Sequence, residues 1–131
     1  MRWIALGMVA LLAACGPSPR EKADLFGAGC NFLPRSLDKG GIALVIAQAD
    51  EAYFKRDGEI VRLASDAGSA ELPYLARAKY DGLTYSVSLD LDEEAGKQSG
   101  DETIDYPSTL TIRDAQGRPV FTENGTTQCG A

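Results

Sequence analysis

Two Asp-Gly pairs divide the middle of the chain into short runs of residues that favour β-strands. Glycine adopts positive φ angles freely, so an Asp-Gly pair between two such runs is a strong hairpin signal. The sequence therefore predicts two successive antiparallel hairpins. Their turns and strands are Asp57-Gly58 between Ala52–Lys55 and Glu59–Ala64, and Asp81-Gly82 between Tyr74–Tyr80 and Leu83–Leu91.

The run Leu83–Leu91 has the clearest strand pattern in the chain. Its odd positions are apolar or aromatic and its even positions are polar, as expected for a strand with one buried face. A third hairpin is predicted where Thr109–Arg113 turns into Pro119–Glu123, and Ile42–Ala47 is typical of a buried strand. About seven short strands, nearly all in hairpins, predict an all-β fold: a small antiparallel meander that forms a sandwich or a barrel.

Composition narrows the classes of function. The chain has 131 residues with 13 Lys and Arg, 19 Asp and Glu, and no His. A net charge of −6 disfavours nucleic-acid binding, which depends on clustered cations. Without His, Ser–His and Cys–His catalysis are both impossible, and no glycine-rich phosphate-binding motif is present. We therefore expect no enzyme activity, no cofactor and no nucleic-acid partner.

The first residues have the layout of an export signal. A positive charge at Arg2 precedes the apolar run Ile4–Ala14, which has about eleven residues where a membrane-spanning helix needs about twenty. The run ends in Leu12-Ala13-Ala14-Cys15, which resembles the lipobox of bacterial lipoproteins. The alternative is an ordinary secretory signal cut after an A-x-A site, with Cys15 as an incidental thiol.

The resemblance implies that residues 1–14 are a signal peptide and that Cys15 carries lipid as the first mature residue. Several acyl chains, such as palmitate, hold a protein on a membrane that it does not span. Gly16 stands where enteric bacteria place an Asp to retain lipoproteins at the inner membrane, so we expect the periplasmic face of the outer membrane. We expect residues 15–28 to form a tether with a short helix, and residues 29–131 to form one β domain.

With Cys15 acylated, Cys30 and Cys129 remain. Two thiols in an oxidising compartment are most simply interpreted as one disulfide. This bond would join the start of the folded region to its last turn. Two free thiols are the alternative, while metal binding is less favoured because two ligands without His make no site.

An acidic stretch between residues 90 and 105 holds the carboxylates that best fit a cation. Ca²⁺ takes about six to eight oxygen ligands, and Asp90, Asp92 and Glu94 occupy alternate positions, as in a calcium-binding loop. The match then fails, because Ala95 replaces the turn glycine and Asp101 replaces the bidentate Glu. The four carboxylates are a weak Ca²⁺ candidate, and a solvated, mobile loop is the favoured interpretation.

Tyr53 and Phe54 are the candidate contact residues. Neighbouring residues of a strand face opposite ways, so these two aromatic side chains cannot both enter one core. One of them is either exposed, where it can anchor a partner, or buried under a second layer. We expect a non-catalytic binding module that engages an envelope protein through a strand edge or an aromatic patch. The alternatives are a passive structural or small-ligand-carrying lipoprotein and a Ca²⁺-dependent module.

Overall fold

The structure, a computed structural model, describes residues 28–35 and 44–131. These residues form nine β-strands and two one-turn 3-10 segments, η3 (Pro73–Leu75) and η4 (Glu93–Ala95). The strands are β1 (Gly29–Pro34), β2 (Val45–Ala47), β3 (Glu51–Arg56), β4 (Glu59–Ser65), β5 (Lys79–Asp81), β6 (Tyr85–Leu91), β7 (Lys97–Gly100), β8 (Thr103–Asp114) and β9 (Pro119–Gly130).

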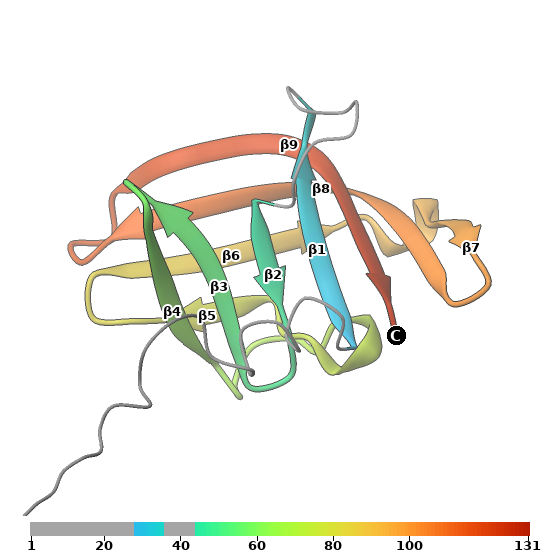
Figure 1. The fold of residues 1–131 in the computed structure, drawn as a ribbon, viewed down its shortest axis with the longest axis horizontal. Coiled ribbons are helices and arrows are strands. Elements are labelled where there is room, and N and C mark those ends of the chain that lie inside the picture. Colours follow the sequence, from blue (N-terminus) through green and yellow to red (C-terminus); the bar gives the residue numbers. More distant parts are fainter. Residues whose placement is uncertain (1–27, 36–43) are drawn as a thin grey trace, which may run out of the picture.

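Eight of the nine strands close a barrel (Figure 1). Consecutive strands pair from β1 to β6, β6 pairs with β8, and β8 pairs with β9. The ring closes where Gly29–Pro34 of β1 pairs with the last residues of β9. Among the described residues β7 pairs with β8 alone. It lies beside the first residues of β8, outside the ring of eight strands. The predicted all-β antiparallel meander is confirmed, and it forms a barrel.

The three predicted hairpin turns are present. Asp57 and Gly58, between β3 and β4, have φ angles of 52° and 82°, the left-handed pair that matches the twist of a tight hairpin. Gly82 follows β5, and its amide donates to the Tyr85 carbonyl at 2.8 Å. Between β8 and β9, the Asp114 carboxylate accepts hydrogen bonds from two backbone amides of the turn, each at 2.9 Å.

Other strand predictions are wrong or incomplete. A single strand over Tyr74–Tyr80 is not formed, because η3 occupies its start and β5 begins only at Lys79. Leu83, expected on a buried face, is fully exposed because β6 begins at Tyr85. β1 and β7 carry no strand pattern that predicts them from the sequence. Ile42 and Ala43, at the start of another predicted strand, lie outside the described residues, as does nearly all of the predicted tether.

Side chains fill the interior of the barrel. An eight-stranded barrel is just wide enough for this, so its strands alternate between inward apolar and outward polar residues. In β6, for example, Val87 and Leu89 are buried in the core while Asp90 is exposed. The largest fully buried side chains come from six different strands: Tyr80, Phe32, Leu110, Val45, Val87, Thr127, Cys30 and Cys129.

Loops and turns form two distinct surfaces of the barrel. Residues 66–78, which we call the cover segment, pack η3 against β1 and β9. Away from this segment, the β3–β4, β5–β6 and β8–β9 turns lie together at the left of Figure 1. There the Arg56 guanidinium lies 5.3 Å from the centre of the Tyr85 ring, and Tyr85 pairs with Asp114 at the end of β8. We call this region the turn face.

Candidate functional site

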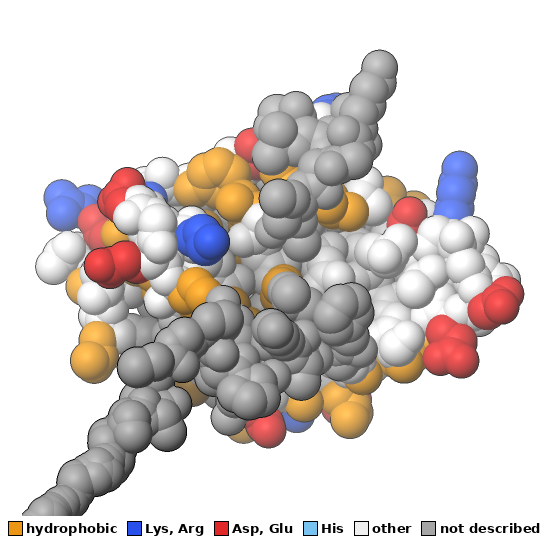
Figure 2. All heavy atoms as spheres, viewed as in Figure 1, with side chains coloured by type: hydrophobic (Ala, Val, Ile, Leu, Met, Phe, Trp, Pro, Cys, Tyr) orange, Lys and Arg blue, Asp and Glu red, His pale blue; other side chains and the backbone are white. Residues whose placement is uncertain are grey.

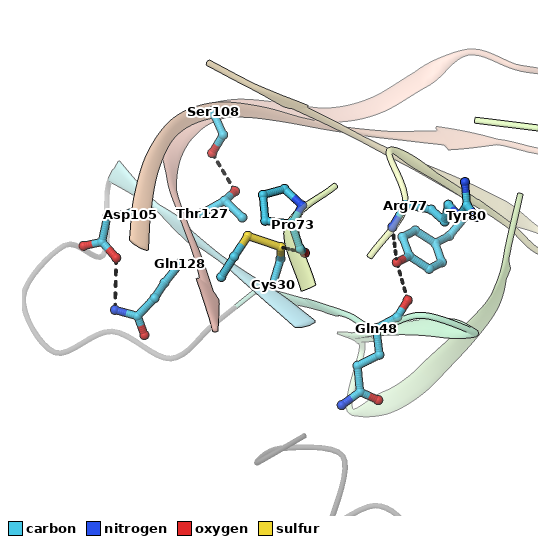
Figure 3. Close-up of a disulfide and its surroundings, with 10 residues drawn as sticks. Cys30, Gln48, Pro73, Arg77, Tyr80, Asp105, Ser108, Thr127 and Gln128 are labelled. Atoms are coloured by element: carbon cyan, nitrogen blue, oxygen red, sulfur yellow. Dashed lines mark hydrogen bonds between the residues drawn. A yellow bond between two sulfur atoms is a disulfide. The ribbon is translucent and has the colours of Figure 1, made fainter. Parts of the chain in front are cut away.

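The predicted Cys30–Cys129 disulfide is present and fully buried. The two cysteines are direct partners in the β1–β9 ladder, 99 residues apart in the sequence. The Cys30 sulfur lies 3.6 Å from the carbonyl oxygen of Pro73, so the bond lies directly against the cover segment (Figure 3). The disulfide therefore joins the two strands that close the barrel, at the point where η3 packs on them.

Tyr80 connects the cover segment to the barrel (Figure 3). Its ring is fully buried, its hydroxyl donates to the carbonyl oxygen of Gln48, and it accepts from the backbone amide of Arg77 at 2.8 Å. Burial raises the pKa of the Tyr80 phenol, against the lowering effect of the Arg77 amide. A second buried polar pair, Ser108 and Thr127, shares a hydrogen bond of 2.7 Å between β8 and β9. These bonds satisfy polar groups and present no reactive atom to solvent.

The four carboxylates of the Ca²⁺ candidate do not converge. Asp90 lies in β6, Asp92 and Glu94 lie before and within η4, and Asp101 lies in the turn between β7 and β8. No group of three His, Cys, Asp or Glu that could hold a metal ion occurs within residues 28–35 and 44–131. The interpretation of the whole acidic stretch as a loop is wrong, since it contains η4 and β7.

Tyr53 and Phe54 are both buried, so neither is the exposed contact that the sequence suggested. Phe54 is 5% exposed inside the barrel, where its ring meets Tyr85 edge to face at 5.6 Å. Tyr53 points the other way and does not belong to the core cluster, yet it is only 8% exposed. The guanidinium of Arg62 lies 4.7 Å from the centre of the Tyr53 ring. The structure therefore supports the other interpretation, in which one of the two, here Tyr53, is buried outside the core.

The described residues line two open hollows of moderate size. The larger, of about 340 Å³, combines Arg35 with Asp90 and Asp92, and the hydroxyl of Thr109 in its lining donates to Asn124 at 2.8 Å. The smaller, of about 280 Å³, lies beside Arg62 and is lined by Asp50, Glu51, Leu63 and Ala64 as well. Both are open surface depressions with charged residues in their lining, unlike the enclosed apolar cavities that hold most small ligands.

Large apolar side chains are exposed at four described positions. Three of them belong to the turn face, one from each hairpin: Ile60 is 38% exposed, Leu83 100% and Val120 42%. Figure 2 shows hydrophobic side chains mixed with charged ones at this end of the molecule. The fourth is Leu75, 61% exposed, in η3 of the cover segment. None of the four is predicted as a contact residue from the sequence, because single apolar residues next to turns carry no distinctive pattern.

Cys15, the predicted lipidation site, lies outside the described residues. Over the described ranges, no helix is both long and apolar enough to span a membrane. No known family model matches the chain, and no curated protein or solved structure does either.

Proposed function

We propose that this protein is a lipid-anchored lipoprotein of the bacterial envelope that acts as a non-catalytic binding module for another envelope protein. The anchor rests on the export signal and on Leu12-Ala13-Ala14-Cys15, which place a modifiable cysteine at the right distance from the N-terminus. The Cys30–Cys129 disulfide agrees with an oxidising compartment, since disulfides persist mainly in exported proteins.

The observation that carries the binding function is the contrast between a filled interior and apolar side chains left on the outside. Phe32, Tyr80 and Leu110 fill the barrel, so binding is expected on its exterior. Apolar side chains exposed on turns are suited to become buried against a partner protein. The hollow of about 340 Å³ is the observation that favours the second candidate, a carrier of a small polar ligand.

The anchor is tested by Cys15→Ser. We expect the native chain to fractionate with membranes and to incorporate labelled fatty acid, and we expect the variant to lose the label and to accumulate as unprocessed or soluble protein. Cys30→Ser is the matched control, because it removes a different cysteine and should keep the label. Unchanged membrane fractionation of Cys15→Ser, with no label on either protein, would rule out the lipobox.

The binding function is tested with the full acylated chain, tagged at its C-terminus and purified from its host envelope in mild detergent. One protein recovered at near-equal stoichiometry is the expected result. Recovery with the disulfide intact, and loss after reduction, would tie the interaction to the folded barrel. If nothing is recovered in either state, the binding module is wrong, and metabolite binding to the larger hollow becomes the next measurement.

A further inference from the structure

The turn at η3 has a backbone conformation that its residues disfavour. Tyr74 has φ 59° and ψ 35°, and Leu75 follows with φ 69°. In this left-handed region the Cβ atom crowds the backbone, and glycine is the residue that usually occupies it. Two consecutive residues with large side chains are therefore strained here.

The surroundings hold this turn in one shape. The Leu72 amide donates to the Ala76 carbonyl at 2.7 Å across the turn, and both residues are buried in the core. Further along, the Ala78 amide donates to the Ala70 carbonyl at 2.9 Å, and the Arg77 guanidinium donates to the Ser69 carbonyl at 3.1 Å. With buried residues on both sides and hydrogen bonds on each flank, the turn is a rigid projection.

Packing accounts for one of the two strained residues. Tyr74 is partly buried and packs against the hydrophobic core, so the burial of its side chain offsets part of the backbone strain. Leu75 is 61% exposed, so most of its side chain faces solvent. Glycine would adopt φ 69° without strain, so folding alone gives no reason for a leucine at this position. Retained strain of this kind is typical of functional sites.

The charge around the turn indicates the kind of surface that it can meet. Glu71 is exposed beside the turn, whereas the Arg77 guanidinium, which keeps its positive charge, donates to the Ser69 carbonyl from a partly buried side chain. Glu93 is exposed in η4, which contacts β8, and Tyr106 of β8 belongs to the core cluster against which Tyr74 packs. An anionic lipid surface would repel these carboxylates, and a single leucine buries little area in a bilayer. A protein pocket with an apolar floor and a basic rim fits better.

We propose that the Tyr74–Leu75 turn is the docking element of this protein, and that Leu75 inserts into an apolar, basic-rimmed pocket of its envelope partner. This proposal rests on the proposed binding function and names the surface that performs it. A rigid turn loses little conformational entropy on binding. The turn is therefore preorganised for its partner, because the cost of holding it in this conformation is met when the protein folds. The turn face, which also exposes a leucine, is the competing surface.

Site-specific photo-cross-linking tests the placement. The photoreactive residue p-benzoylphenylalanine replaces Leu75 in one full-length acylated chain and Leu83 in another, each expressed in its own host and irradiated in intact envelopes. A discrete protein adduct from position 75 and none from position 83 is the expected result. Adducts from position 83 alone overturn the docking turn but keep the binding function. Lipid adducts alone from position 75 overturn the docking turn in favour of a membrane contact, and no adduct at either position counts against both proposals.

A pair of glycine variants separates docking from folding. Leu75→Gly should unfold at a temperature no lower than that of the native chain. Glycine relieves the left-handed strain at this position, and this gain offsets the greater conformational freedom of glycine in the unfolded chain. The same variant should bind the cross-linked partner at least about tenfold more weakly. Leu83→Gly, the matched control, should keep native affinity. Native affinity in Leu75→Gly overturns the proposal, and so does a loss of affinity that only accompanies a lower unfolding temperature.

Discussion

Tyr80 is the residue whose hydroxyl joins the cover segment to the β2–β3 turn. Tyr80→Phe removes the bonds to the Gln48 carbonyl and the Arg77 amide while keeping the buried ring. Leaving buried polar groups without partners costs about 1–3 kcal/mol, so we expect the free energy of unfolding to fall by that amount. Urea denaturation measures it. Tyr106→Phe is the control, because no hydrogen bond to the Tyr106 hydroxyl occurs in the part of the chain that the structure describes, and it should change the midpoint little.

The same hydroxyl predicts a dependence on alkaline pH. Burial raises the pKa of Tyr80 above the ordinary value of 10.0, so the unfolded chain loses this proton at a lower pH than the folded chain. The contribution of Tyr80 to stability is therefore complete below about pH 10 and is lost as the pH rises above it. Tyr80→Phe should lose less stability than the native chain over this range. An equal loss in both proteins would show that other tyrosines carry the effect.

At the scale of single elements, β9 can cross β1 closely because position 125 has no side chain. A Cβ atom on Gly125 would overlap the Leu33 carbonyl oxygen and lie 2.8 Å from the Phe32 ring. Gly125→Ala should therefore destabilise the barrel by about 1–3 kcal/mol, since neither the β1 backbone nor the buried ring can move freely. Thr122→Ala, at an exposed position of the same strand, should stay within about 0.5 kcal/mol of the native chain in thermal unfolding. Equal effects would show that β1 adjusts.

The elements that could be predicted from the sequence are those that a short run of residues specifies by itself. The Asp57-Gly58 hairpin follows from positive φ angles that glycine permits, and the alternation in β6 follows from having one face in the core. β7 was missed because it lies outside the barrel with all its residues exposed, so nothing imposes an apolar alternation on it. β1 has only a short alternation around Cys30 and Phe32, and what holds it in place is β9, far away in sequence.

The candidate site was less predictable than the fold. The Cys30–Cys129 pairing follows from the number of thiols once Cys15 is assigned to the lipobox, and the structure confirms the pairing. Of the two interpretations of Tyr53 and Phe54, the exposed contact is wrong and burial of one of them outside the core is supported. A strand pattern cannot decide between the two, because the outcome depends on tertiary neighbours. Leu75 had no signal at all, since left-handed φ angles are expected at Gly or Asn, and here they fall on a tyrosine and a leucine.

For the whole molecule, the disulfide is the largest single contribution that one experiment can remove. It closes a loop of 99 residues, for which chain entropy predicts a stabilisation of about 4.7 kcal/mol. Reduction should lower the free energy of unfolding by about 3–5 kcal/mol, which is measured as a lower denaturation midpoint. The double variant Cys30→Ala with Cys129→Ala should match the reduced protein and ignore reductant. An unchanged midpoint after complete reduction would mean that the β1–β9 ladder holds without the bond.

The β1–β9 pairing also has a consequence for the order of events in time. Gly29, at the start of β1, pairs with Gly130, at the end of β9. A chain that emerges N-terminus first can form its hairpins one by one. β1, however, can pair with its second neighbour, β9, only after β9 has emerged. The barrel can therefore close only after β9 has emerged, whereas its hairpins can form earlier.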